Sequence, residues 1–192
     1  MTAWKALLPT GRVVLAAALL ATAGLMWSWL PTKLQSWAPI DVHGTVGQRV
    51  TGRNLAVTVH STYLAHEVTA KGIQGLNRFP SKGVWLVMVL SYAPLLKPEV
   101  PRFAVQAEGK TFTTNLSGFG SFVQPEMPTR GPLAFELPTA PPSATLLVVN
   151  KRTDSGGFDM DSAPLDSQVA ITMPLAGCVP RASLNLNELS HG

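Results

Sequence analysis

The chain has 192 residues, a length that corresponds to one domain with appended segments. Hydrophobic residues make up 46% of it and charged residues only 14%, whereas a typical soluble protein is about 25% charged. The net charge of +4 includes no run of five or six basic residues and no basic stripe with interleaved aromatic residues, which argues against nucleic-acid binding. Cys178 is the single cysteine, so no intramolecular disulfide can form and the fold must be stabilised by packing.

Residues 13–30 form an apolar segment without a charge, and Pro31 follows it. A helix of this length, at about 1.5 Å per residue, approaches the ~30 Å thickness of the hydrocarbon core of a bilayer. The segment predicts a transmembrane helix that acts as a signal anchor, with residues 1–12 in the cytoplasm and the following domain outside it. Four side chains are expected at the membrane interfaces, where indole rings and basic groups are favoured: Arg12, Trp27, Trp29 and Lys33.

A cleaved signal peptide is the alternative interpretation of the same segment. The sequence ATAG at 21–24 has the small residues of a signal-peptidase site, and cleavage near Ala23 would release a secreted domain. That cleavage would leave GLMWSWLP as an apolar new N-terminus, and the apolar run exceeds the ~7–15 residues of a usual signal core. We therefore expect the anchor to be retained.

After residue 54, short apolar segments rich in β-branched residues alternate with turns that contain proline and glycine. The segment 83–94 is almost continuously apolar, which predicts a central strand covered on both faces. A hairpin is predicted with strands at 103–107 and 110–114 around a turn at 108–109. Further strands are expected at the following places: 55–60, 132–138, 144–151 and 167–175. This pattern predicts an all-β protein, an antiparallel β-sandwich of 7–8 strands preceded by the one N-terminal transmembrane helix.

Several of these segments resemble a family of immunoglobulin-like extracytoplasmic domains of unknown function. The matching elements are NLAVTV, GVWLVMVLSY, FAVQAEGKTFTT and PEMPTRGPLAFELP, followed by TLLVVN and QVAITMPL. Members of this family occur in Gram-positive, actinobacterial-type bacteria behind a lipoprotein signal or a single membrane anchor. The resemblance covers about residues 52–175 and implies an immunoglobulin-like sandwich, with no catalytic residues to carry over.

The remaining segments complete the predicted organisation. Residues 31–52 mix proline, glycine and polar residues and predict a juxtamembrane linker. The sandwich domain is expected at 53–176. Residues 177–192 alternate only weakly and predict a flexible C-terminal tail.

An aspartate-rich loop is the candidate metal site. It gathers oxygen ligands of the kind that calcium prefers, although their spacing is not that of a calcium-binding loop and loop acids are usually solubilising. The four aspartates are Asp154, Asp159, Asp161 and Asp166. The histidines have no metal-binding spacing, and His60 falls on the polar face of its predicted strand, where we expect a solvated ring. No cofactor is expected.

A second candidate site is the loop 117–132, in which Phe119 and Phe122 lie among glycines and serines. Exposed aromatic residues in such a loop can bind a protein partner. The alternative is that both rings cap an open end of the sandwich.

These observations predict a protein that is not an enzyme. We expect a single-pass cell-membrane protein whose extracytoplasmic sandwich binds or scaffolds an unknown membrane or envelope component. The alternative is a secreted or anchored enzyme or ligand carrier whose site is assembled from loops.

Overall fold

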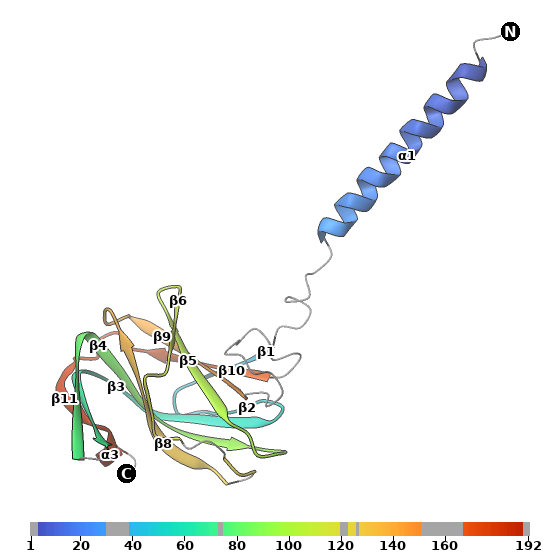
Figure 1. Ribbon diagram of the computed structural model, residues 1–192. Helices are drawn as coiled ribbons and strands as arrows, with labels where there is room; N and C mark the ends of the chain where they lie inside the picture. The colour runs from blue at the N-terminus through green and yellow to red at the C-terminus, as the bar shows by residue number, and fades with distance from the viewer. Residues whose placement is uncertain are drawn as a thin grey trace. The chain divides into compact units, whose positions relative to one another are not determined.

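The computed structural model describes residues 4–29, 39–72, 75–119, 123–125, 127–150 and 167–189 (Figure 1). Within the N-terminal helix, side chains are described at residue 11 and at 13–29. The chain divides into two compact units, Met1–Trp37 and Ala38–Gly192. Each unit is described by itself below.

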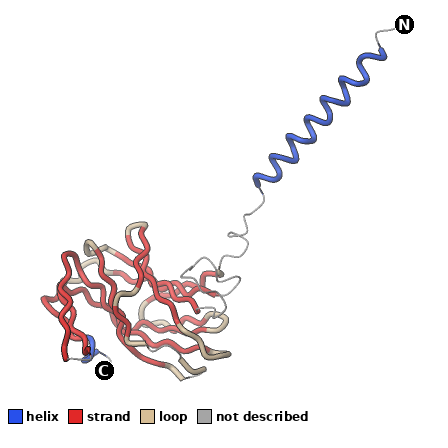
Figure 2. The backbone as a smooth tube through the Cα atoms, viewed as in Figure 1, coloured by secondary structure: helices blue, strands red, loops and turns tan. Residues whose placement is uncertain are grey.

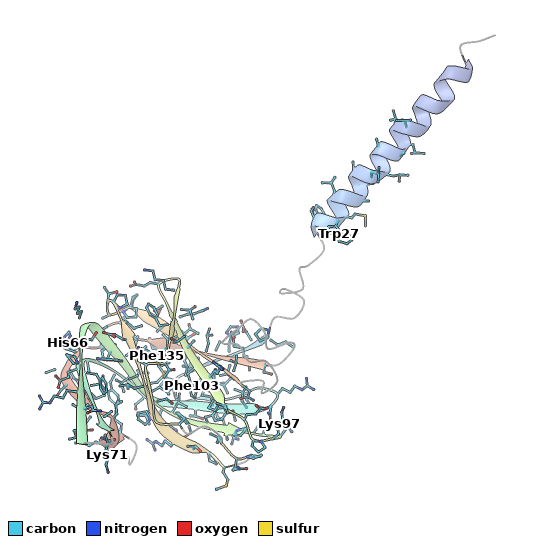
Figure 3. All side chains as sticks on the ribbon, viewed as in Figure 1. Trp27, His66, Lys71, Lys97, Phe103 and Phe135 are labelled. Atoms are coloured by element: carbon cyan, nitrogen blue, oxygen red, sulfur yellow. The ribbon has the colours of Figure 1, made fainter. Side chains whose placement is uncertain are left out.

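The first unit contains helix α1 (Trp4–Trp29). Its large apolar side chains are exposed, from Leu19 at 62% to Trp29 at 87%, and Figure 3 shows them projecting around the helix up to Trp27. Among the residues that the structure describes, no helix is both long enough and apolar enough to cross a membrane. No transmembrane helix is thus found in the described residues of α1, and the membrane anchor predicted at 13–30, which extends one residue past them, stays a prediction.

The second unit is a β-sandwich of two sheets, as predicted (Figure 2). The first sheet has the order β1 (Ile40–Thr45), β10 (Ser167–Pro174), β9 (Ser143–Asn150), β5 (Pro101–Ala107) and β6 (Lys110–Thr113). The second has the order β11 (Arg181–Asn185), β3 (Leu55–Gly72), β4 (Gly75–Pro94), β8 (Thr129–Leu137) and β7 (Leu116–Ser117), and β2 (Arg49–Thr51) also pairs with β3. Two pairs are parallel, β1 with β10 and β11 with β3, so the sandwich is not antiparallel throughout.

The second half of strand β4 is central and largely buried on both faces, which confirms the prediction for the apolar run at 83–94. Alternate residues such as Leu86 and Met88 face the core between the two sheets and are fully buried. The residues between them, including Trp85 and Val87, belong to a second buried cluster on the outer face of the sheet. Because both faces of this part of the strand exclude water, apolar residues occupy almost every successive position in its sequence.

The predicted hairpin is also confirmed, as β5 and β6. Its two turn residues, Glu108 and Gly109, have positive φ angles of 50° and 73°. Positive φ at both central positions is the geometry of a type I′ turn, whose twist matches that of the flanking strands. Glycine adopts this backbone conformation without steric cost, which explains its place in the turn.

Two segments outside the predicted sandwich boundaries belong to it. Part of the predicted linker 31–52 forms β1 and β2, and part of the predicted flexible tail 177–192 forms β11 and the one-turn helix α3 (Leu186–Leu189). Leu184 and Leu186 are 6% and 5% exposed, because they cover the outer face of β3 and β8. Burial of these two side chains, which the weak local pattern does not reveal, orders the segment.

Candidate functional site

The candidate site lies on the outer face of the second sheet, where a row of polar residues crosses four neighbouring strands. Arg49 on β2 is paired with Thr58 on β3, Thr58 with Ser91 on β4, and Ser91 with Arg130 on β8. Side chains at directly opposed positions of a sheet share one face. The register therefore places two hydroxyl groups between two guanidinium-bearing residues.

His60 joins this row through an irregularity in β3. Val59 pairs with Leu90 and Ser61 pairs with Val89, so His60 has no partner on β4 and forms a β-bulge. A bulge bends the strand and redirects the side chain of its extra residue. The Nε2 atom of His60 lies 2.7 Å from the hydroxyl oxygen of Ser91, at hydrogen-bonding distance.

A pocket of about 450 Å³ lies at this row, and we call it the outer-face pocket. Its small residues include Ala56 and Ala93, paired across β3 and β4 and only 4% and 5% exposed. Since these side chains are short, they leave a hollow between the longer residues around them. The full lining is Arg49, Ala56, Thr58, His60, Ser91, Tyr92, Ala93, Leu95 and Pro128.

The charges around the outer-face pocket are positive. Burial, followed by the charge of Arg130, lowers the pKa of His60 below its ordinary value of 6.5, because both disfavour the imidazolium form. The ring is therefore neutral at pH 7, with one nitrogen able to donate and the other to accept. In the described part of the chain, no carboxylate lies within 4.0 Å of Arg49 or Arg130.

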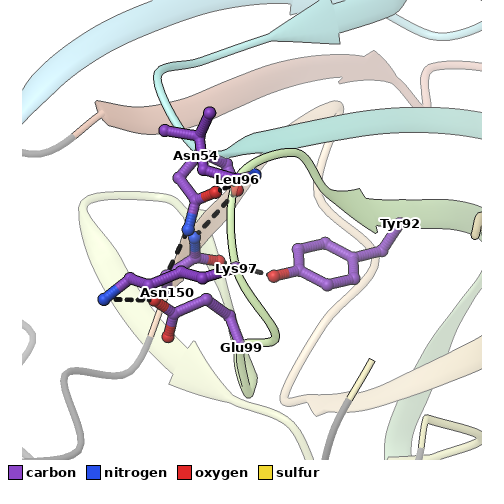
Figure 4. A network of polar contacts seen from close by, with 6 residues as sticks. All are labelled: Asn54, Tyr92, Leu96, Lys97, Glu99 and Asn150. Atoms are coloured by element: carbon purple, nitrogen blue, oxygen red, sulfur yellow. Dashed lines mark hydrogen bonds and ion pairs between the residues drawn. The ribbon is translucent and has the colours of Figure 1, made fainter. Parts of the chain in front are cut away.

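A second polar cluster is buried at one end of the sandwich and is centred on Asn54 (Figure 4). The Asn54 side-chain oxygen accepts a hydrogen bond from the Leu96 backbone N–H at 2.6 Å, and its amide nitrogen donates to Glu99 at 3.4 Å. Its backbone carbonyl accepts from the Asn150 amide at 3.1 Å. Asn54, Glu99 and Asn150 are 4%, 6% and 8% exposed, so these bonds are shielded from water.

The outer members of this buried cluster complete its hydrogen bonding. The Tyr92 hydroxyl donates to the Asn150 side-chain oxygen at 2.6 Å, and the Lys97 ammonium lies 3.0 Å from the Glu99 carboxylate. No buried side-chain nitrogen or oxygen of the described residues lacks a partner. The cluster thus ties together the start of β3 and the ends of β4 and β9, and its role is structural.

Phe119 lies against the core at the same end of the sandwich. Its ring centroid is 5.1 Å from that of Phe103 and 6.5 Å from that of Tyr92. The side chain is partly buried against the core, as expected for a cap on the open end. A contact between Phe119 and a partner stays a prediction.

Other residues singled out in the sequence fall in different places. Trp27 and Trp29 are exposed on α1, and Arg12 lies within that helix. No group of three or more potential metal ligands occurs in the ranges that the structure describes. Six predicted residues lie outside those ranges: Lys33, Phe122, Asp154, Asp159, Asp161 and Asp166.

Nothing in the sequence indicates that Arg49, Thr58, Ser91 and Arg130 belong to one site. Each lies on a different strand, and only the register between strands brings them together. The alternation of apolar and polar residues correctly predicted that His60 lies on the polar face of β3. The bulge that aims it at Ser91 has no signal in a single sequence.

No family model and no curated protein sequence matches the chain. Among solved structures, it is similar to an uncharacterized beta-sandwich protein from Clostridium difficile, at 9% identity and a TM-score of 0.36, over 74% of this chain and 99% of that chain. Both proteins are β-sandwiches, and a TM-score of this size implies no closer relation. The resemblance to the immunoglobulin-like family stays a prediction.

Proposed function

We propose that the chain is a single-pass, membrane-anchored binding or scaffold protein of the cell envelope. In this proposal residues 13–30 lie in the bilayer, and the sandwich, of immunoglobulin-like type, lies outside the cytoplasm and binds another membrane or envelope component. The observation that carries the proposal is the exposure of apolar side chains around α1.

Leu19 and Leu20 are 62% and 75% exposed, although successive helical residues point about 100° apart. A helix that is apolar all round is stable only when something apolar covers it. A lipid bilayer fits this segment, because Trp27 and Trp29 at its end are residues that favour the headgroup region.

The geometry of the sandwich favours binding over catalysis. Ser91 and His60 are close enough for proton exchange, which a nucleophilic serine requires. However, Ser91 lies within the regular ladder between Thr58 and Arg130, whereas the serine of a nucleophile elbow lies on a sharp strand-to-helix turn. A small-molecule or surface-group binding site is the simpler role for such a pocket on a rigid sheet.

Site-specific photocrosslinking of the full chain in intact membranes tests this proposal. A photoreactive residue at Pro128, which lines the outer-face pocket, is expected to give one discrete adduct with an envelope component. The matched control position is Lys110, exposed on the β5–β6 hairpin of the other sheet, where no such adduct is expected. Failure to obtain an adduct at Pro128, or equal adducts at both positions, would contradict the proposal.

A further inference from the structure

The outer-face pocket has the residue types and the charge of an anion-binding site. Strands in a sheet are about 4.8 Å apart, so Arg49 and Arg130, three strands from each other, have backbones about 14 Å apart. Arg49 lines the outer-face pocket, and Arg130 lies beside it, because it is paired with Ser91 and its charge acts on His60. Between them lie the hydroxyl groups of Thr58 and Ser91.

The donors in this row suit phosphate oxygen atoms. A guanidinium group carries five N–H donors in a planar fork that matches phosphate geometry, and hydroxyl groups donate to the same oxygens. The neutral imidazole of His60 adds either a donor or an acceptor next to Ser91. Bonds from charged donors to phosphate are about twice as strong as bonds between neutral groups.

Among the described residues, no acidic side chain forms an ion pair with Arg49 or Arg130. The two ion pairs among the described residues involve Arg78 with Glu67 and Lys97 with Glu99, so neither uses a residue of the outer-face pocket. The buried alanines beneath the pocket reduce solvation from one side, which strengthens electrostatic attraction. The volume of about 450 Å³ exceeds what a lone phosphate needs and accommodates a substituent on it.

We propose that the outer-face pocket binds a phosphate group, carried by a small soluble phosphate compound or by a phospholipid headgroup. Arg49 and Arg130 bind the oxygens from two sides, and Thr58, Ser91 and His60 contact the group between them. This inference goes beyond the proposed function and does not depend on it, because a soluble phosphate would bind whether or not the chain is anchored.

Calorimetric titration of the full chain in detergent micelles with inorganic phosphate tests the site. Chloride at equal ionic strength is the reference for general screening. The double variant Arg49→Gln/Arg130→Gln is expected to lose about tenfold or more in affinity, because each removes charged hydrogen bonds. The double lysine variant, Arg49→Lys/Arg130→Lys, keeps both charges and is expected to retain part of the affinity.

The control variant is Lys110→Gln, which removes an exposed positive charge from the other sheet and is expected to bind phosphate normally. A circular dichroism spectrum like that of the native chain shows that each variant is folded. The proposal is overturned if the native chain binds phosphate no better than chloride, or if the folded double glutamine variant binds as well as the native chain. The proposal is also overturned if Lys110→Gln loses as much phosphate affinity as the double glutamine variant, since phosphate binding would then depend on net charge alone.

A parallel measurement separates the two sources of phosphate. The chain is placed in nanodiscs of zwitterionic lipid alone or with added phosphatidylglycerol, and inorganic phosphate is titrated into each. A lipid headgroup in the pocket would compete and weaken phosphate binding in the anionic discs for the native chain. Undiminished binding in both discs assigns the site to a soluble phosphate compound.

Discussion

Replacing Asn54 with alanine is expected to lower the free energy of unfolding by about 3 kcal/mol. The change removes the acceptor of the Leu96 N–H, in a partly buried hydrogen bond, and a donor to the Glu99 carboxylate, in a buried one. Glu99 would keep its ion pair with Lys97 but lose the bond that satisfies it inside the protein. A buried polar group without its partner costs about 1–3 kcal/mol, and a charged one costs more.

Denaturant unfolding of the full chain in mild detergent, followed by circular dichroism, measures this effect. The matched control is Asn115→Ala, because Asn115 accepts one hydrogen bond, from the Glu136 N–H, at an exposed site. We expect the free energy of unfolding of the control variant to fall by about 1 kcal/mol or less. Similar losses in the two variants would show that the buried cluster does not stabilise the end of the sandwich.

Replacing Phe135 with alanine is expected to lower the free energy of unfolding by about 3–5 kcal/mol. Phe135 is fully buried on β8 in the core between the two sheets, opposite Leu86 of β4. Its removal loses the transfer energy of the ring and leaves a cavity that the paired strands on either side prevent from closing. The ring therefore contributes more than its area alone suggests.

The same unfolding measurement checks this prediction, with an unchanged dependence on denaturant as evidence that the fold is retained. Phe112→Ala is the control, since Phe112 is only partly buried against the same core. If Phe135→Ala lowers the free energy of unfolding no more than Phe112→Ala does, the assignment of Phe135 to the centre of the core is contradicted.

The central strands were predictable because their own residues determine them. The apolar run that forms the second half of β4 and the turn at Glu108 and Gly109 both appear directly in the local sequence. The polar first half of β4, from Gly75, was not predicted, because its residues are largely exposed and have no apolar pattern. That half is a strand because it pairs with the second half of β3.

Two edge strands, β1 and β11, were missed for a related reason. β1 and β11 are short, mostly exposed, and pair in parallel with strands far away in sequence. Their hydrogen bonds come from a partner strand, and a local pattern of hydrophobicity carries no information about such a partner.

The candidate site was the least predictable part. Nothing in the sequence sets Arg49 and Arg130 apart from other basic residues, and they lie in the same row of side chains only because of the strand register. The aspartates and phenylalanines were chosen as candidates because they cluster along the chain, whereas the pocket gathers residues from three strands and from the segments next to β4 and β8. Sites that are built across a sheet leave no motif in one sequence.

Retention of the full chain in washed membranes tests the central claim, that residues 13–30 anchor the protein, most directly. After an alkaline carbonate wash, the native chain is expected in the membrane pellet with the mass of the uncleaved protein. The variant Leu19→Arg/Leu20→Arg is expected in the supernatant, because each charge costs about 2.5–3.5 kcal/mol at the centre of a membrane helix. The control Leu76→Arg/Leu96→Arg changes two similarly exposed leucines of the sandwich and is expected to stay in the pellet. Release of the native chain by carbonate, or a mature protein that begins at Gly24, would contradict the account.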